Sequence, residues 1–563
     1  MKKLIALILV FVLTASLFCA CGGGGEENDI GNHGGADLIE TGESGEDSEF
    51  VAGPNAYTPY DELITFTTAR NTVNGASFPE GMSMTDNPIV DAVYDKLNVE
   101  MDVVWQTSDY NTKLDMCIVS EDLPDIFWVD NYMTFTELLE CDMIQPLTQA
   151  YKDCAGVYMQ EVYASYGNDI FDPFTFNGEL YALPSTNNGY QYPVLWIRQD
   201  WLDALGLEVP TTRDELAAVA KAFMEQDPGH NGAGNTIGIA VQSSPIGGSN
   251  SFTLDPIFNS FGSYPGQWLT DDDGNVFYGS TAEQTKEALE YVSGLYKDGI
   301  LDQQFVVRDF SDVVGMMATG RCGICFYPWS LPYSISDFAN NCPDGQWTVL
   351  EAPVNENGEF TYISNRLENG ILCVNKDFDY PELLIKLLNV EFDMFRGIDE
   401  EGYEALTPVF DAGTTWTALM MTGAFNLEYD NAVPAVGELV KNYIEKGVTP
   451  SGTTRYNIQL VEKAKNYFDD PVASNSEGWI LYTSRYIASN SLSTGVKIPS
   501  AYNYSTETMT TRWATLEKQE DEYFLKVIIG EASIDGFDNF VEQWKSLGGD
   551  IITAEVQDIV DGN

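Results

Sequence analysis

Hydrophobic and polar residues alternate in the first part of the chain body with two periods, one typical of strands and one of helices. The segments that these patterns predict are a strand at 63–67, a helix at 88–97, a strand at 99–105, a helix at 111–120 and a strand at 123–128. Pro88 supports the first helix, because proline is favoured in a first helical turn. Strands that alternate with helices predict an α/β fold with a mostly parallel sheet covered by helices.

Later segments also have the spacing of amphipathic helices. Two of them begin with a capping-box pattern, Thr212-x-x-Glu215 and Ser280-x-x-Glu283. A third begins at Pro381. A fourth presents one aromatic and apolar stripe made of Phe537, Phe540, Val541 and Trp544. We interpret that stripe as core rather than as a ligand site, because aromatic residues at helical spacing most often pack inside.

The N-terminus has the pattern of a secretory signal. Two lysines precede an apolar run at 4–13 and small or apolar residues up to Ala20, a segment too short to span a membrane. Its end resembles a bacterial lipobox, in which a small residue precedes a cysteine that is lipidated, and Cys21 fits that position. We expect residues 1–20 to be removed and Cys21 to carry the lipid. The alternative is an ordinary secreted protein with an unpaired cysteine.

The next stretch predicts a flexible tether over residues 21–55. Residues 22–50 contain nine glycines, nine acidic residues and no lysine or arginine. Such a composition cannot bury enough apolar surface to offset the entropy of ordering the chain. The remaining residues, 56–563, are expected to form the folded body, and the lipid would be its only membrane attachment.

Charge excludes several classes of function. The chain has 563 residues, 28 Lys+Arg against 86 Asp+Glu, and a formal net charge of −58. Binding to nucleic acid or to anionic lipid is disfavoured, because both need lysine or arginine to replace counterions. The same argument favours a neutral or weakly cationic solute. Only 2 histidines are present, which makes a multi-histidine metal site or a Ser-His-Asp triad improbable.

Seven cysteines lie outside the signal region, an odd number in a chain too large to need disulfides. Cys322 and Cys325 form a lone C-x-x-C pair inside an apolar run. Redox or metal chemistry is one interpretation of this pair. A buried strand is the favoured one, because only Arg321 provides a positive charge that would lower a thiol pKa.

Several blocks of the body resemble the family 1 extracellular solute-binding lipoproteins of sugar ABC importers. The blocks are SEDLPDIFW at 120–128, NGELYALP at 177–184 followed by LWIRQD at 195–200, GRCGICFYPWS at 320–330, and the tail that begins IGEASID at 529–535. They occur in the order of the family and cover most of the chain behind the lipobox. The third block resembles the maltose-binding members, and the tail resembles the longer oligosaccharide-binding members.

The resemblance implies a two-lobed α/β fold of the type II periplasmic-binding-protein kind. Crossing strands near 184–195 and 361–373 would join the lobes, and the ligand would lie in the cleft between them. Lobe 1 would comprise about 56–188 plus about 366–440, and lobe 2 about 189–365 plus the C-terminal helices at about 441–563. A ligand that contacts both lobes stabilises the closed state, which the importer recognises.

The same resemblance selects candidate ligand-binding residues. A pyranose needs a flat aromatic surface for its apolar face and planar polar groups for its hydroxyls. Trp128, Asp130 and Trp329 match family positions that bind sugar, and Tyr327 stands where the family has a glycine two residues before that last tryptophan. Tyr190, on the first crossing, and Trp416, after a Gly-rich turn, are added as weaker candidates. Core packing explains Tyr190 and Trp416 about equally well.

A loop at 227–238 resembles the calcium-binding loop of alginate-binding relatives. The oxygen donors that it retains are the side chains of Asp227, Asn231 and Asn235 and the carbonyl of Ala233. Two carboxylate positions of that loop are occupied here by Gly229 and Asn235, and calcium affinity falls with carboxylate count. We therefore favour a structured loop over a bound calcium ion. An EF-hand is excluded, because its twelfth residue would be Gly238 rather than glutamate.

The predicted function is a lipid-anchored substrate-binding component of an ABC importer, on the extracellular face of the membrane, that captures a neutral carbohydrate. Its expected partners are the carbohydrate and the permease subunits; we expect a monomer that binds no nucleic acid and needs no cofactor apart from the calcium considered above. No nucleophile-elbow, Walker A or H-E-x-x-H motif indicates an enzyme. The alternatives are a surface glycan-binding protein without transport and a surface polysaccharide-degrading enzyme.

Overall fold

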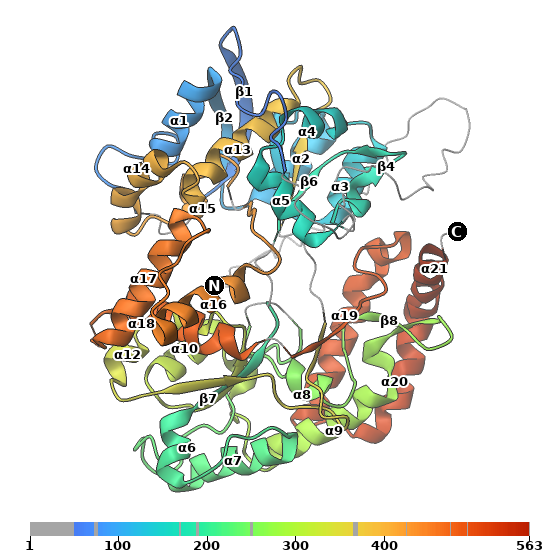
Figure 1. Ribbon diagram of the computed structural model, residues 1–563. Coiled ribbons are helices and arrows are strands. Elements are labelled where there is room, and N and C mark those ends of the chain that lie inside the picture. The colour runs from blue at the N-terminus through green and yellow to red at the C-terminus, as the bar shows by residue number, and fades with distance from the viewer. Residues whose placement is uncertain are drawn as a thin grey trace, which may run out of the picture.

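The computed structural model describes residues 50–72, 77–167, 170–186, 191–247, 251–363, 370–423, 425–472, 474–492 and 494–561. These residues form two α/β lobes, one above the other in Figure 1. The upper lobe combines blue and cyan elements from the first third of the chain with gold elements from beyond residue 370, so it is discontinuous in sequence.

The first lobe is built on a five-stranded sheet of order β2-β1-β3-β13-β6. Its strands are β1 (Ile64–Asn71), β2 (Val99–Thr107), β3 (Ile126–Val129), β6 (Leu183–Pro184) and β13 (Ile371–Val374). Strand β1 is parallel to β2 and to β3, whereas β13 is antiparallel to β3 and β6. The parallel half is the part that the alternating sequence pattern predicts.

Helices cover both faces of this sheet and share one core with it. They are α1 (Pro88–Leu97), α2 (Tyr110–Ser120), α3 (Tyr132–Glu140), α4 (Thr148–Cys154), α5 (Val157–Tyr166), α13 (Glu382–Arg396), α14 (Glu400–Asp411) and α15 (Trp416–Leu419). The predicted start of α1 is confirmed: Asn87 accepts hydrogen bonds from the backbone N–H groups of Ile89 and Val90, and Pro88 is the first helical residue.

The second lobe contains a three-stranded sheet of order β10-β7-β11, which is antiparallel throughout. Its strands are β7 (Val194–Arg198), β10 (Ile324–Tyr327) and β11 (Trp347–Leu350). Parallel pairing in the described part of this lobe is confined to isolated bridges, such as Ala240 with Cys325, and to one short pair of strands, β12 (Thr361–Ile363) with β14 (Val496–Ile498). The sequence pattern predicts a mostly parallel sheet, and for this lobe that prediction is wrong. The central strand β7 follows a crossing segment and pairs antiparallel with both β10 and β11.

Cys322 lies just before β10 and Cys325 lies within it, and both are fully buried free thiols. Burial raises the pKa of the Cys322 thiol to about 12. A buried strand is therefore confirmed as the environment of this pair, because a thiol with a raised pKa is a poor nucleophile and a poor metal ligand.

The helices of the second lobe are α6 (Gln199–Leu205), α7 (Arg213–Gln226), α8 (Asp255–Asn259), α9 (Glu283–Lys297), α10 (Phe310–Ala318), α11 (Leu331–Ser334), α12 (Phe338–Asn341), α19 (Glu507–Ile528), α20 (Phe537–Trp544) and α21 (Asp550–Val560). The capping box of Thr212 and Glu215 at α7 is confirmed. The aromatic stripe of α20 is confirmed as core, since Phe537, Phe540 and Trp544 are buried.

The capping box predicted at Ser280 is wrong. Helix α9 begins after Ala282, which makes no side-chain cap. The Ser280 hydroxyl instead donates a hydrogen bond to Glu520 Oε1 on α19 at 2.6 Å and accepts one from the backbone N–H of Gly266 at 2.7 Å. A buried carboxylate from the far end of the chain therefore takes the hydroxyl that the local pattern assigned to the helix.

A helical layer lies against the second lobe on the side of the first. It consists of α16 (Ala432–Lys446), α17 (Arg455–Asp469), α18 (Ser476–Leu481) and the π-helix η5 (Tyr482–Ala488). Helix α17 also contacts the first lobe: the Tyr403 hydroxyl of α14 donates to Gln459 Oε1 at 2.9 Å, and the rings of Phe395 and Tyr456 lie 5.5 Å apart.

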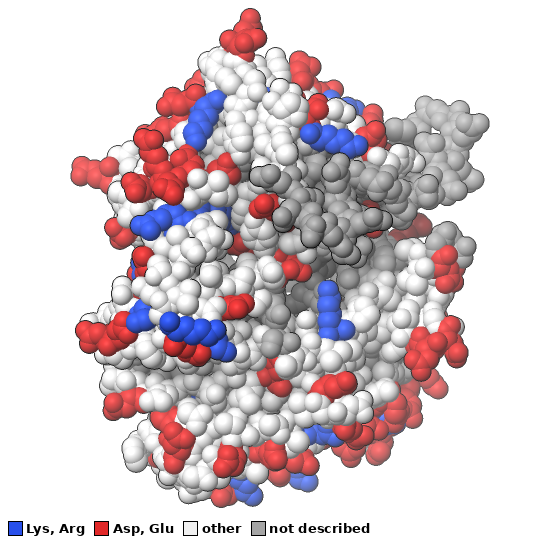
Figure 2. Space-filling model, in the orientation of Figure 1, with Lys and Arg blue, Asp and Glu red and all other residues white. Residues whose placement is uncertain are grey.

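No helix in the described part of the chain is both long and apolar enough to cross a membrane. Acidic side chains are spread over both lobes on the face shown in Figure 2, where basic side chains are fewer.

The buried carboxyl of Glu520 predicts a pH dependence of stability. Burial raises its pKa from 4.5 to about 7. The folded state therefore holds this proton more tightly than the unfolded state does, and stability falls as pH rises from about 4.5 to about 7. Glu520→Gln should remove about 2 kcal/mol of this loss between pH 5 and pH 8, measured by urea unfolding. Glu522→Gln, at an exposed position of α19, is the matched control; equal pH slopes for all three proteins would contradict the prediction.

Candidate ligand-binding site between the lobes

The chain passes between the lobes at strand ends that lie at the facing edges of the two sheets. In the first sheet, Ile371 at the start of β13 pairs with Val129 at the end of β3 and with Pro184 at the end of β6. In the second sheet, Tyr327 at the end of β10 pairs with Val194, the first residue of β7. Side chains at these strand ends are therefore the ones that can meet a solute between the lobes.

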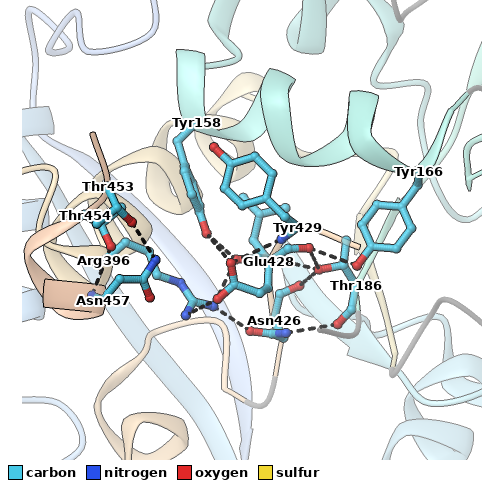
Figure 3. Close-up of polar contacts among 11 residues, drawn as sticks. Tyr158, Tyr166, Thr186, Arg396, Asn426, Glu428, Tyr429, Thr453, Thr454 and Asn457 are labelled. Carbon is cyan, nitrogen blue, oxygen red and sulfur yellow. Dashed lines mark hydrogen bonds and ion pairs between the residues drawn. The ribbon is translucent and has the colours of Figure 1, made fainter. Parts of the chain in front are cut away.

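The chain passes between the lobes between β6 and β7, which we call the first passage, and again before β13, the second passage. A third passage lies between Leu427, which belongs to the core of the first lobe, and Val433, which belongs to a core of the second lobe. Its backbone is hydrogen-bonded to the first passage (Figure 3). Thr186 N–H donates to Asn426 O at 2.8 Å, and Glu428 N–H donates to Thr186 Oγ1 at 2.7 Å. Two passages that are distant in sequence are thus held together at the point where the lobes separate.

Glu428 is also one half of a buried ion pair. Its Oε2 lies 2.5 Å from Arg396 Nη1, at the end of α13, and the side chains are 13% and 7% exposed. Arg396 donates further hydrogen bonds to Asn426 Oδ1 at 3.0 Å and to Leu427 O at 3.1 Å (Figure 3). Burial is the largest single effect on the pKa of Arg396 and acts to lower it, but the charge of Glu428 and the contributions of Tyr158 and Tyr456 together raise it by more, so the guanidinium stays charged.

Two tyrosines of α5 fix the same segment from the first lobe. The Tyr158 hydroxyl donates to Leu427 O at 2.9 Å, and the Tyr166 hydroxyl donates to Glu428 O at 2.9 Å (Figure 3). Burial raises the pKa of Tyr158 well above its ordinary value, so its hydroxyl remains a donor. This segment is therefore held in a defined conformation on the first-lobe side.

On the second lobe, four side chains form what we call the aromatic cradle: Trp329, Tyr333, Tyr456 and Arg485. The Arg485 guanidinium lies 4.1 Å from the centre of the Trp329 ring, and the Tyr333 ring stands edge-on to Trp329 at 5.9 Å. Burial raises the pKa of Tyr456, which is close enough to Arg485 and Tyr333, and to the Arg396–Glu428 pair, for their charges to act on it. The aromatic cradle thus adjoins the passages between the lobes.

The predicted stacking residue Trp329 differs from expectation in its exposure. It is 3% exposed and has Arg485 against one face, whereas Tyr333 beside it is 45% exposed. Tyr333 is therefore the ring of the aromatic cradle that offers an open face. Trp329 as a ligand contact stays a prediction.

On the first lobe, Trp128 occupies the end of β3 and is partly buried. Its ring stands edge-on to Tyr110 at 5.6 Å, and Tyr110 contacts Trp105 at 4.8 Å, so three aromatic rings lie in a row at this sheet edge. Asp130 is the first residue after β3 and is exposed. Its carboxylate accepts hydrogen bonds from the side-chain amides of Asn111 and Asn131. Trp128 and Asp130 are thus placed where a solute could reach them.

The other predicted ligand residues are more dispersed. Tyr327 is buried between Phe252 and Ser334, with its hydroxyl 3.2 Å from that of the serine. Trp416 begins α15 and packs 5.8 Å from the ring of Phe395 in the first lobe. Tyr190 and Cys21 lie outside the described residues. Trp128 and Trp329 therefore come to the facing edges of the two lobes, and Tyr327 and Trp416 lie among core side chains.

Sequence reasoning missed Tyr333, Tyr456 and Arg485. Tyr333 lies four residues after the predicted Trp329, and this spacing could have indicated that the two rings are neighbours. The other two come from α17 and η5, more than a hundred residues farther along, and their periodic pattern does not show which helix face meets Trp329.

The loop at 227–238 is closed by its own hydrogen bonds. Asp227 accepts from the N–H groups of Asn231 and Gly232 and from the Thr236 hydroxyl at 3.0, 2.8 and 2.6 Å, and these bonds lower its pKa, with the Thr236 hydroxyl contributing most. The Asn235 amide donates to Asn231 O at 2.9 Å. Ala233 lies in the turn between them. No group of three or more His, Cys, Asp or Glu side chains that could hold a metal occurs in the described part of the chain.

A second contact joins the lobes away from the passages. The ring of Tyr132, at the start of α3, lies 4.1 Å from that of Tyr504, which precedes α19. Tyr504 packs against the core of the first lobe although its chain neighbours belong to the second. The lobes thus meet on two sides of the region that separates Trp128 from Trp329.

Comparison with known proteins identifies relatives of this chain by sequence. YtcQ of Bacillus subtilis, a polygalacturonan/rhamnogalacturonan-binding protein, is 25% identical over 393 residues, 68% of this chain and 70% of its own. Lipoprotein LipO of the same organism is 23% identical over 481 residues, 84% of this chain and 88% of its own.

The fold is also similar to that of a solved structure, the ABC-transporter substrate-binding protein FusA of Streptococcus pneumoniae in complex with kestose. The TM-score is 0.58 at 16% identity, over 88% of this chain and 99% of that one. The two-lobed α/β fold expected from the sequence is confirmed by this likeness.

The model of the family described as bacterial extracellular solute-binding protein matches residues 75–364, which is more than half of the chain. The resemblance that the sequence blocks indicated is thereby confirmed: the chain belongs to the bacterial extracellular solute-binding protein family.

Proposed function

We propose that this protein is the substrate-binding component of an ABC importer and captures an oligosaccharide between its lobes. The observation that carries the proposal is that each lobe places a tryptophan at the sheet edge that faces the other lobe, Trp128 in the first lobe and Trp329 in the second. The chain also belongs to the solute-binding family. The ring of Trp128 on the first lobe and the open ring of Tyr333, next to Trp329 on the second, suit the apolar faces of a chain of sugar rings. A sugar that contacts both surfaces favours the closed arrangement of the lobes.

The relatives support a carbohydrate as the ligand. YtcQ is named for binding polygalacturonan and rhamnogalacturonan, and the FusA structure contains kestose. LipO is named as a lipoprotein, which agrees with a lipid on Cys21 and a tether that keeps the lobes near the outer face of the membrane. Permease subunits are the partners that this function requires, and we propose a monomer without nucleic-acid partners.

Two finer parts of the proposal rest on sequence reasoning. The neutral ligand that the sequence predicts rests on the net charge of −58 alone, so a test of the ligand has to include acidic as well as neutral oligosaccharides. The assignment of Asp130, Tyr190, Tyr327 and Trp416 as further ligand contacts follows from the family resemblance. Bound calcium at 227–238 is the weaker alternative to a self-bonded loop, because the carboxylate of Asp227 already accepts three hydrogen bonds.

A panel of neutral and acidic oligosaccharides tests the function. We expect one class to raise the melting temperature without being cleaved, because binding to the folded state alone stabilises it by mass action. Melting temperature and released sugar are measured in the same samples. Sugar released without any added enzyme would make the protein a polysaccharide-degrading enzyme, and no stabilisation by any oligosaccharide would contradict a carbohydrate ligand.

The open ring of the aromatic cradle gives a sharper test than Trp329, whose truncation would also cost about 3–5 kcal/mol of core packing. Tyr333→Ala should weaken binding of the stabilising sugar about 10-fold and change the unfolding free energy of the ligand-free protein by less than about 0.5 kcal/mol. Calorimetric titration and urea unfolding measure the two quantities.

The matched control is Phe468→Ala, at a similarly exposed aromatic residue whose ring contacts are with Tyr482 and Tyr486. It should leave sugar affinity unchanged. An equal effect of both substitutions would remove Tyr333 from the binding surface.

The buried ion pair between Arg396 and Glu428 allows a test of what holds the third passage in place. Glu428→Gln leaves Arg396 buried without a counter-charge and should lower the unfolding free energy by about 3 kcal/mol. Glu438→Gln, at an exposed position of α16, should change it by less than about 0.5 kcal/mol. Urea unfolding measures both, and a loss as small as that of the control would show that the pair does not hold the passages together.

A further inference from the structure

Two arginines of this strongly acidic chain are buried without a carboxylate partner. The buried guanidinium groups of Arg198 and Arg396 form ion pairs with Asp200 and Glu428. Arg485 and Arg70 are 7% and 3% exposed, and neither forms an ion pair with any described residue. With 86 acidic residues in the chain, two buried arginines that form no ion pair with a described residue need an explanation.

Arg485 belongs to the aromatic cradle and brings several unsatisfied polar atoms together. Its Nε, the indole Nε1 of Trp329 and the hydroxyl of the adjacent Ser484 are all buried with no hydrogen-bond partner among the described residues. The guanidinium lies 4.1 Å over the Trp329 ring, so the two N–H donors are neighbours. Arg485 lies on the π-helix η5, a distortion found often at functional sites.

Arg70 occupies the corresponding edge of the first lobe. Thr68 of β1 pairs with Ile126 of the parallel strand β3, so Arg70 is level with Trp128. Its Nη1 and Nη2 are buried and have no hydrogen-bond partner in the described part of the chain. Burial lowers its pKa to about 10, and Tyr110, which contacts Trp128, is near enough to influence it.

The acid whose charge acts on Arg70 does not accept its hydrogen bonds. Glu391 of α13 acts on it electrostatically, but the Glu391 carboxylate accepts its hydrogen bonds from Met421 N–H, Thr422 N–H and the Thr422 hydroxyl. Both lobes therefore present a guanidinium with unused donors beside the tryptophan at the inter-lobe edge.

We propose that the captured carbohydrate is acidic, an oligosaccharide with uronate units whose carboxylates bind to Arg485 in the second lobe and to Arg70 in the first. This inference rests on the proposed carbohydrate-binding function and replaces the neutral ligand predicted from net charge. A carboxylate has only acceptors and matches the fork of a guanidinium, which a sugar hydroxyl does less well. The uronate-containing polymer named for YtcQ agrees with this ligand class.

The net charge of the chain does not oppose this ligand. Charges on the outer surface are screened over about 8 Å at physiological ionic strength, whereas partly buried charges are screened much less. The acidic side chains in Figure 2 lie on the molecular surface, whereas Arg485 and Arg70 are buried.

The test compares trigalacturonate, its methyl ester and maltotriose by calorimetric titration of the full mature protein. The ester has the same sugar skeleton without the negative charge. Trigalacturonate should bind at least about 10-fold more tightly than its ester at about 0.15 M salt. Equal affinity for acid and ester, or tighter binding of maltotriose, would overturn the acidic ligand and leave carbohydrate capture intact. No binding of any oligosaccharide in the panel would overturn the proposed function itself.

Variants assign the recognition to the two arginines. Arg485→Gln and Arg70→Gln should each weaken trigalacturonate binding about 10- to 100-fold and leave the affinity for the ester unchanged. Arg485→Lys should recover part of the loss, because it restores the charge without the fork. Arg512→Gln, at an exposed position of α19, is the control. A preference for the acid that survives both glutamine variants would overturn the role of these arginines; if a variant does not fold, the acid–ester comparison on the unaltered protein still decides the ligand class.

Discussion

The two-lobed arrangement depends on one buried pair of charges, Arg396 and Glu428. The arginine ends a helix of the first lobe, and the glutamate lies in the segment that leaves that lobe. A buried charge that loses its partner is strongly unfavourable, so the pair keeps this segment in one conformation. Thr186 and the tyrosines of α5 bind the same segment through its backbone. The passages between the lobes are therefore well defined on the side of the first lobe, which is what a hinge requires.

Local patterns were sufficient for much of the fold. The alternation of strands and helices predicts the parallel half of the first-lobe sheet and the helices around it. The helix caps at Asn87 and Thr212 form as predicted from Pro88 and Glu215, the residues that follow them. Ser280 shows the limit of such patterns. Its hydroxyl bonds to Glu520, 240 residues away, and a partner at that distance along the chain cannot be found from a four-residue pattern. The antiparallel second sheet escaped prediction for a similar reason, since β7 pairs with strands that follow much later.

The candidate site was predictable only where a sequence block ends a strand. Trp128 and Trp329 follow β-rich blocks and lie at the facing sheet edges. Tyr456 and Arg485 come from helices whose apolar periodicity does not reveal a polar or aromatic contact across the helical layer. Net charge was equally uninformative about the site, because it sums over an outer surface whose charges are screened from the region between the lobes.

The contact between Tyr132 and Tyr504 bears on the opening of the lobes as well as on their architecture. These rings join the lobes at 4.1 Å, away from the passages that form the hinge. The lobes can separate on this side only when the two rings part, which costs about 0.5–1.5 kcal/mol of aromatic contact. The ease with which the lobes open is therefore set in part by two residues that belong to none of the passages.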